Sequence, residues 1–550
     1  LSRTSHTDCT IAEVNFTRGP FKAENITATT IEPNATTGTI TLNASSATMW
    51  NANHIGALWQ ITHTIGANSV EGSFVGTATG NSASLTVLLD QYFDFSTHSA
   101  APNWTGTIIL QKSYDSGTTW KDVIPVHYEN DGNIQYSEKE IVKDAIYRVH
   151  METHTSGKCN YSLIARSFDV HGVVKITAFT DANTVTATVI NTLGDTNATT
   201  YWAEGAWSID EGFPQAIAFY EERLCFAATK NQPQTIWCSE TDSWESFNAG
   251  TNDTSALVFT IASDQLDSIR WMVSQNVLLV GTASGEWKIS AAEGADAPMN
   301  PANIMAKRQS SYGSARIQPK VMNNVVLFVQ RMAKKIRELV YSYELDTWIA
   351  PDLTVLSEHI TGTGITEMAF QKTPDPILWC VRSDGTLSTM TYNREQEVVA
   401  WSRQVTDGEF ESVAIIPGDG EDEIWVVVKR TVDGSVVRYI EQFQPRDWGS
   451  DDKDIFFVDS GLTFDGGAAV TITGISQASP CVVTAVGHGF TDGEQIRITG
   501  VSGMTQVNSK VYTVHTVVDV NSFQIRDKTD AVNINSVAFT AYGSGGSVEQ

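Results

Sequence analysis

Short apolar runs recur at near-equal intervals between residue 212 and residue 443. Runs such as NVLLVGT, VVLFVQR and ILWCVRS each follow one apolar run and precede another. Their centres lie about 50 residues apart, which is the period of a unit of three to four short strands. Five centres can be assigned: Phe226, Leu279, Phe328, Trp379 and Trp425. The pattern predicts a β-propeller over residues 212–465, with a stacked solenoid as the alternative.

Alternating apolar and polar positions continue on both sides of the repeats. Residues 81–180 contain runs such as SASLTVLLDQYF and WTGTIILQKSY, separated by Gly, Asp and Asn turns, which favours a β-sandwich domain. Residues 1–80 are rich in Thr, Asn and Gly and predict a segment of irregular strands, and residues 181–211 predict a return to that segment. Residues 470–550 predict a small, self-contained β domain. We therefore expect an all-β chain, incomplete at its N-terminus because it starts at Leu1 and not at Met.

The net charge of the chain disfavours some classes of binding partner. Asp and Glu outnumber Lys and Arg by 63 to 36, so the formal net charge is −27. Such a charge disfavours a protein that holds nucleic acid by its phosphates, although an acidic wall would let DNA slide past without sticking. No apolar run reaches the roughly 20 residues that span a membrane. The six cysteines show no CxxC spacing, so we expect neither a zinc site nor a disulfide framework. Cys225, Cys238 and Cys380 lie in apolar strand patterns, where we expect buried free thiols.

One stretch, SYDSGTTW, follows the Asp-box pattern S-x-D-x-G-x-T-W that recurs in sialidase propellers. Its side chains can close a hairpin turn, because the carboxylate accepts hydrogen bonds from the residues that follow and the glycine can take a positive φ. The residues concerned are Ser113, Asp115, Gly117, Thr119 and Trp120. We interpret the motif as a structural turn, since it lies outside the repeats and occurs once.

A search for catalytic patterns predicts no active site, cofactor or metal. The chain contains no GxSxG, HExxH, Walker A or GxGxxG sequence. The histidines His150 and His154 lie in a strand-like segment, where surface positions are expected. Five repeat-region arginines can in principle converge on a substrate carboxylate: Arg270, Arg308, Arg316, Arg331 and Arg337. The basic run from Lys307 to Arg337 is more simply an exposed face or a subunit contact than a DNA-reading surface.

The repeats carry a resemblance to a known family. Stretches such as GFPQAIAFYEERLCFAATKNQPQTIWCSETDSWESF, FTIASDQLDSIRWMVSQNVLLVGTASGEWKIS and RQSSYGSARIQPKVMNNVVLFVQR resemble the tail nozzle (tail tubular B-like) proteins of short-tailed bacteriophages, in order over about residues 212–445. The stretch TRGPFKAENITATTIEPNATTGTITLNA resembles the platform that precedes the propeller in these proteins. The last segment, VVTAVGHGFTDGEQIRITGV, is similar to the small FCCH-like β-barrel of ubiquitin-activating enzymes and of many phage tail proteins.

The resemblance implies a structural virion protein of the phage tail. Nozzles of this family form a homo-oligomeric ring, typically of six subunits, below the portal and adaptor proteins. They close the channel and conduct DNA, without sequence-specific binding, during genome ejection, and they contact tail fibres or spikes. Two other classes stay open: a receptor- or carbohydrate-binding tail adhesin, suggested by the sandwich and barrel, and a sialidase-like glycosidase, suggested by the Asp box.

Overall fold

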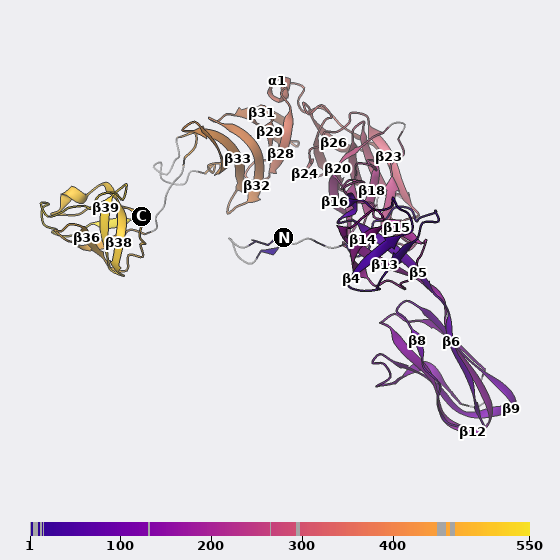
Figure 1. The fold of residues 1–550 in the computed structure, drawn as a ribbon. Helices are drawn as coiled ribbons and strands as arrows, with labels where there is room; N and C mark the ends of the chain where they lie inside the picture. Colours follow the sequence, from indigo (N-terminus) through magenta and orange to yellow (C-terminus); the bar gives the residue numbers. More distant parts are fainter. Residues whose placement is uncertain are drawn as a thin grey trace. The chain divides into compact units, whose positions relative to one another are not determined.

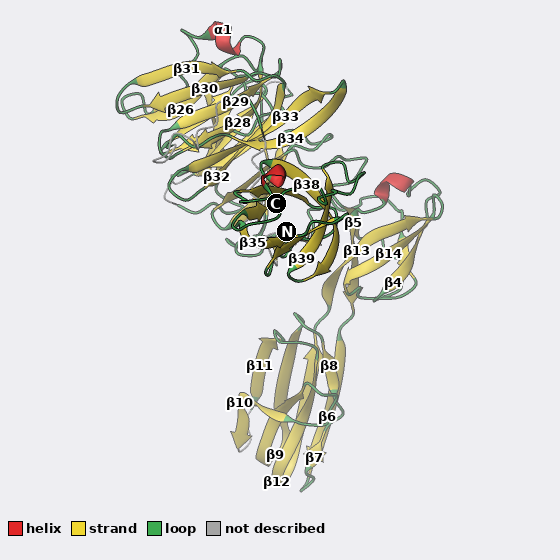
Figure 2. Cartoon of the chain, turned by 90° about the vertical axis from the view of Figure 1, so that its left-hand side faces the viewer, coloured by secondary structure: helices red, strands yellow, loops and turns green. Residues whose placement is uncertain are grey.

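The computed structural model describes residues 2–3, 9–10, 14, 16–129, 133–263, 266–292, 297–447, 458–461 and 468–550. It divides the chain into two compact units, Leu1–Arg446 and Asp447–Gln550. Almost every regular element is a strand, so the all-β prediction is confirmed (Figures 1 and 2). The described helices are short: η1 (Ala52–His54), α1 (Glu358–Thr361) and η3 (Thr505–Val507). The predicted end of the repeats at residue 465 lies outside the described residues.

Six strands near the start of the chain form the platform sheet, whose order is β15-β5-β13-β14-β4-β3. Their alternating apolar side chains pack on Trp50 and Trp59, two buried rings whose centroids lie 4.5 Å apart. A separate two-stranded pair, β1 (Ser2–Arg3) with β2 (Cys9–Thr10), precedes it. The platform strands are β3 (Ile31–Pro33), β4 (Thr39–Ala44), β5 (Leu58–Ile65), β13 (Phe168–Phe179), β14 (Thr184–Asn191) and β15 (Trp202–Glu204).

The predicted sandwich is inserted between two paired strands of the platform sheet. Strand β5 ends at Ile65 and β13 begins at Phe168, and these two residues are cross-strand partners. The insertion therefore begins earlier and ends earlier than the predicted limits of 81 and 180, because residues 168–179 hydrogen-bond to the platform. It contains β6 (Asn68–Val75), β7 (Gly80–Asn81), β8 (Leu85–Val87), β9 (Tyr92–Ser113), β10 (Lys121–Glu129), β11 (Ile134–Lys139) and β12 (Ala145–Ala165).

One continuous seven-stranded sheet, folded across its middle, makes this inserted domain. The long strands β9 and β12 run through both halves, and their register shifts between Met151 and Lys158 (Figure 2). Backbones approach closely at the fold: a Cβ on Gly157 would lie 2.1 Å from the Asn103 carbonyl oxygen. Phe93 from one half then meets Tyr147 from the other, with ring centroids 4.3 Å apart. The two halves enclose a single apolar core, as the two sheets of a sandwich do.

Five antiparallel sheets follow one another between residues 216 and 442, and in each the strands occur in sequence order. The first four have four strands and the fifth has three. The second strand of each sheet carries one of the five predicted repeat centres. The strands are β16 (Ala216–Tyr220), β17 (Arg223–Ala227), β18 (Thr235–Cys238), β19 (Leu257–Thr260); β20 (Ile269–Ser274), β21 (Leu278–Thr282), β22 (Glu286–Ala291), β23 (Ile304–Ser310); β24 (Lys320–Met322), β25 (Val325–Val329), β26 (Ile336–Ser342), β27 (Thr347–Ile349); β28 (Ile365–Gln371), β29 (Ile377–Arg382), β30 (Leu387–Asn393), β31 (Val398–Gln404); β32 (Glu409–Pro417), β33 (Asp422–Val432) and β34 (Ser435–Gln442).

Consecutive sheets pack face to face through apolar cores. The first and second sheets share one core, the second and third another, and the pattern continues to the fifth sheet. Three pairs of first strands in neighbouring sheets lie in contact: β16 with β20, β24 with β28, and β28 with β32. Among the core clusters of the described residues, none joins the first sheet to the fifth. Closure of the five sheets into a propeller ring therefore stays a prediction.

The second unit contains a closed barrel with the strand order β35-β36-β39-β38-β37-β40. The short C-terminal strand closes it by pairing with both β35 and β37. Phe523, Met504 and alternate strand residues fill the interior and are fully buried. The strands are β35 (Val470–Ile475), β36 (Cys481–Ala485), β37 (Gln495–Thr499), β38 (Lys510–Asp519), β39 (Ser522–Asp527) and β40 (Ser547–Glu549).

Candidate functional site

The Asp-box residues form a closed turn between β9 and β10. The Asp115 carboxylate accepts hydrogen bonds from the Thr119 amide (2.8 Å), the Thr119 hydroxyl (2.6 Å) and the Ser113 hydroxyl (2.7 Å). Gly117 has a φ of 89°, and the Trp120 indole N–H donates to its carbonyl (2.9 Å). The turn thus occupies the carboxylate and the indole N–H of the motif, and neither is left to act on a substrate.

These hydrogen bonds also fix the charge of the motif. The pKa of Asp115 is lowered from 3.8 to about 2, first by the hydrogen bonds from Thr119 and then by that from Ser113. A carboxyl with this pKa is ionised at neutral pH and is unsuited to act as a general acid. Beside the turn, the Arg148 guanidinium lies 3.9 Å from the Trp120 ring centroid, so the ring also packs against a cation.

The five repeat centres occupy equivalent strands but do not face the same way. Leu279 and Trp379 point toward the following sheet, whereas Phe328 points toward the preceding one. Phe226 packs in an aromatic cluster on the outer face of the first sheet, with Phe16, Trp207 and Phe247. Strands buried on both faces are apolar at every position, so the sequence does not mark which face each residue occupies. The sequence therefore shows the period of the repeats, but it does not show on which face of its sheet each repeat centre lies.

Three basic residues of the run from Lys307 to Arg337 make side-chain contacts within the chain: Arg308, Lys335 and Arg337. Arg308 donates to the Ser284 carbonyl (2.7 Å), and Arg337 donates to the Ala350 carbonyl (2.6 Å). The Arg337 guanidinium also lies 3.5 Å from the ring centroid of Tyr312. Lys335 pairs with Asp352 at 2.9 Å and Glu358 at 2.8 Å. These arginines do not converge on a substrate carboxylate.

Two of the five arginines lie near enough for their charges to interact: Arg270 on β20, and Arg316 in the segment that leads into β24. Arg270 occupies a β-bulge in β20, between residues that pair with Thr282 and Gly281. The nearby Arg316 charge lowers the pKa of Arg270, second to the effect of burial. Lys320, which begins β24, is partly buried with a pKa lowered by burial. Lys320 could not be singled out from the sequence, because its burial depends on how the sheets pack.

Two fully buried carboxylates stabilise the second sheet. Asp267 accepts hydrogen bonds from the Thr282 hydroxyl (2.6 Å) and from the hydroxyl and amide of Ser284 (2.7 and 2.8 Å). Glu286 accepts from the hydroxyls of Ser310 and Ser314, and burial raises its pKa. Each carboxylate is therefore hydrogen-bonded by its own neighbours, as buried charges require. Neither is arranged as half of a paired acid and base.

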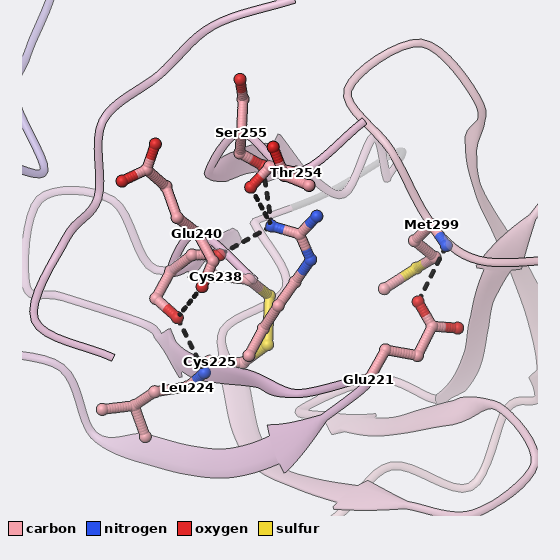
Figure 3. Close-up of a disulfide and its surroundings, with 10 residues drawn as sticks. Glu221, Leu224, Cys225, Cys238, Glu240, Thr254, Ser255 and Met299 are labelled. Carbon is pink, nitrogen blue, oxygen red and sulfur yellow. Dashed lines mark hydrogen bonds between the residues drawn. A yellow bond between two sulfur atoms is a disulfide. The ribbon is translucent and has the colours of Figure 1, made fainter. Parts of the chain in front are cut away.

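The prediction that Cys225 and Cys238 are free thiols is wrong: the structure joins them in a disulfide (Figure 3). The two cysteines are direct partners on β17 and β18, with their Cα atoms 4.0 Å apart. In the same region the buried Arg223 guanidinium donates to the carbonyls of Ser239 (2.7 Å) and Ser255 (2.7 Å). Sequence spacing alone did not reveal the pair, because the register of the two strands is needed. The prediction for Cys380 is confirmed, because it is a buried free thiol; Cys159 and Cys481 are also buried and form no disulfide within the described residues.

The histidines give no metal site in the described part of the chain. His154 was expected at the surface but is buried, and its Nδ1 lies 3.0 Å from the Ala78 carbonyl oxygen. It lies between two register shifts of β12 against β9, which interrupt the regular alternation of exposed and buried positions. His150 is partly exposed, as expected, with its Nδ1 2.8 Å from Asn81 Oδ1. No described helix is long and apolar enough to cross a membrane.

Comparisons with known proteins bear on one part of the chain. The family model of the ubiquitin-activating enzyme E1 FCCH domain matches residues 478–550, which form most of the closed barrel. No curated protein matches the chain. One similar solved structure is a Bacteroides fragilis protein provisionally described as a 6-phosphogluconolactonase. It shares 9% identity at a TM-score of 0.27, covering 64% of this chain and 96% of that one. A likeness at this level carries no argument about function.

Proposed function

We propose that this chain is a structural subunit of a phage tail nozzle, which assembles into a ring around the DNA channel. The observation that carries the proposal is that the first and the last of the five stacked sheets each leave apolar side chains exposed on their outer faces. A subunit with two different exposed apolar faces can form head-to-tail contacts, in which one face of a subunit packs on the other face of the next. Such contacts give a closed ring when the rotation between successive subunits brings the last subunit back to the first.

The outer face of the first sheet is only partly covered. Phe16, Trp207 and Phe247 pack over its middle. Along β16, however, Ile217 and Phe219 are about half exposed, at 51% and 56% of their surface. The exposed Trp244 packs against Phe219, with ring centroids 5.5 Å apart. This apolar group resembles the centre of a subunit interface, where aromatic residues are enriched.

The outer face of the last sheet is also apolar and lacks a neighbour among the described residues. Ile416 and Ile440 are 50% and 75% exposed, and they flank the half-buried Trp425. Strand register places Val427 opposite Ile440 and Trp425 opposite Ala414, so these side chains share one face. The opposite face of the sheet carries the core shared with the fourth sheet.

The remaining parts of the proposal follow from the family resemblance and the charge. The net charge of −27 suits a channel past which DNA phosphates move without binding. Portal and adaptor proteins would contact one end of the ring, with fibres or spikes at its periphery. The inserted sandwich and the barrel are appended domains available for such contacts. In this account the protein works by assembly and displacement of its parts, and no chemical step is assigned to it.

Single charged substitutions on the two outer faces test the assembly. The variants Phe219→Asp and Ile440→Asp should each turn a purified ring into monomers, measured by native mass spectrometry. Val520→Asp is the matched control, because Val520 is 69% exposed but lies in the barrel. Rings that persist in both face variants would contradict this assembly. Saturable binding of a glycan to purified monomer would instead favour the adhesin alternative.

A further inference from the structure

A short linker turn, residues 208–212, lies between the last platform strand β15 and the first stacked sheet. Its backbone closes on itself, since the Gly212 amide donates to the Ser208 carbonyl (2.8 Å). On the side of the first sheet, the Asn231 amide donates to the Glu211 carbonyl (3.1 Å). The Asn231 side chain also donates to the Glu211 carboxylate (3.1 Å). The linker turn is therefore attached to the first sheet through backbone and side chain.

On the side of the platform, the linker turn is held through its two carboxylates. The Asp210 carboxylate accepts hydrogen bonds from the side-chain amides of Asn51 (2.7 Å) and Asn53 (2.6 Å), at the short helix η1. The Glu211 carboxylate pairs with Lys22 at 2.7 Å. Because these contacts involve charged groups, they respond to a change of charge beside them.

His54, the last residue of η1, is buried at this junction with 6% of its surface exposed. Its ring packs against Trp50 and Trp59, with centroids 6.0 and 5.5 Å away. The His54 Nδ1 accepts a hydrogen bond from the Asn51 amide (3.4 Å), which only an unprotonated nitrogen can do. The neutral imidazole is therefore part of the cap that orders η1.

Four charged side chains from outside η1 interact electrostatically with His54: Glu204, Asp210, Glu211 and Lys22. The His54 Nε2 lies 3.7 Å from a Glu204 oxygen and 3.9 Å from an Asp210 oxygen, which is too far for a hydrogen bond. Burial lowers the pKa of His54. The three carboxylates oppose this effect, and the Lys22 ammonium adds to it. The folded chain therefore favours the neutral ring.

The linker turn also borders a cavity of about 150 Å³. The cavity is lined in part by Trp207 and Phe213, the residues on either side of the turn, and by Gly56 and Leu58, which follow η1. Protein interiors seldom leave a space of this size unfilled. On this side the linker turn is therefore not fixed by close packing, and it has room to shift.

We propose that His54 is a pH-sensitive latch, whose protonation releases the linker turn from the platform. A proton on Nδ1 sets two N–H donors against each other, at Nδ1 and at the Asn51 amide, so the cap of η1 is lost. The Glu204 and Asp210 carboxylates can bond to the charged ring only if η1 moves. Such a movement displaces Asn51 and Asn53 from Asp210. In acid the first stacked sheet then gains freedom to move against the platform.

Hydrogen–deuterium exchange of the purified chain at pH 7.5 and pH 5.5 tests the latch, with rates corrected for the intrinsic effect of pH. Peptides that cover η1 and the linker turn should exchange faster at pH 5.5. The increase should be several-fold and at most about tenfold, the limit for one proton bound one pH unit below the ordinary histidine pKa of 6.5. Corrected rates that do not change between the two pH values would overturn the proposal.

Two matched variants assign the change to one histidine. His54→Gln should abolish it, because a glutamine amide can still accept from the Asn51 amide and does not titrate. His171→Gln should keep it, since His171 is exposed on β13 of the same platform sheet. An equal acceleration in His54→Gln would overturn the proposal.

A second measurement needs no substitution of His54. NMR titration of the ring in the folded parent chain should give a pKa below 6.5, because the fold favours the neutral form. A titration at or above 6.5 would overturn the latch, since protonation would then stabilise the junction. The latch lies within one chain, so both experiments can be done on the monomer and do not depend on ring assembly.

Discussion

Ile65 and Phe168 are direct cross-strand partners in the platform sheet, although the whole inserted sheet lies between them in the sequence. The inserted domain therefore enters and leaves at one end of a strand pair. It has its own core of buried side chains, among them Phe93, Phe95 and Tyr147. Such an arrangement is typical of a domain that folds independently of its host.

Replacing residues 66–167 with an Asn-Gly turn should leave the rest of the chain folded. The turn would join Ile65 to Phe168 as a two-residue hairpin, a connection that suits adjacent antiparallel strands. We expect the shortened protein to keep its β-sheet circular dichroism signal and cooperative melting, and the excised domain to melt on its own. Loss of cooperative melting in the shortened protein would show that the platform depends on the insertion.

Gly157 at the fold of the inserted sheet should be intolerant of any side chain. It has a φ of 88°, and an added Cβ would lie 2.1 Å from the Asn103 carbonyl oxygen. Gly157→Ala should lower the free energy of unfolding of the isolated domain by about 3 kcal/mol or more, from left-handed strain and from the clash. Gly76→Ala is the matched control: Gly76 has a φ of 68° and open space around it, so only strain of about 1 kcal/mol remains. Equal losses in the two variants would contradict the close backbone approach.

The Asp-box turn should make the inserted domain less stable in acid. Because the pKa of Asp115 in the folded state is about 2 and its ordinary value is 3.8, the carboxylate stabilises the fold above pH 4. That stabilisation is lost as the pH falls from about 4 to about 2. Asp115→Asn should melt at a lower temperature at pH 7 and show a smaller change between pH 4 and pH 2. A carboxyl titration of Asp115 near pH 4 by NMR would refute the turn geometry.

The Cys225–Cys238 disulfide should stabilise the first stacked sheet. Closing a loop of this size is worth about 3 kcal/mol in the unfolded-chain model. The double variant Cys225→Ala/Cys238→Ala should therefore unfold more easily, and a reducing agent should destabilise the parent chain but not the variant. Peptide mapping without reduction should recover the two cysteines in one linked product. Recovery of both as free thiols would show that the pair is not joined.

The sequence predicted the class of fold better than its internal details. Apolar runs near Leu279 and Trp379 repeat because the second strand of a sheet packed between two other sheets is buried on both faces. That requirement is visible in the residues of the strand itself. Which face of the sheet each residue occupies depends on packing between sheets. Phe226 and Phe328 therefore lie on the face opposite to the one that Leu279 and Trp379 occupy in their own sheets. The disulfide and the partial burial of Lys320 were missed for the same reason, since register and burial arise from contacts distant in the sequence.

The Asp box, in contrast, could be interpreted from the sequence alone. Its side chains bond within a few residues of each other, from Ser113 to Trp120, so local chemistry was enough to interpret it as a turn. The limits of the domains can be predicted only in part, because they depend on both local pattern and distant pairing. The alternation in residues 168–179 looks the same in either sheet, and only pairing with β5 assigns this strand to the platform.

The most direct test of the nozzle proposal is electron microscopy of the purified protein and of an intact particle that contains it, with the subunits counted around the axis. The account predicts a closed ring, six-fold by the family resemblance, at the distal end of the tail channel. In that ring the face containing Phe219 on one subunit meets the face containing Ile440 on the next. A monomer, or a trimeric spike lying off the channel axis, would contradict it.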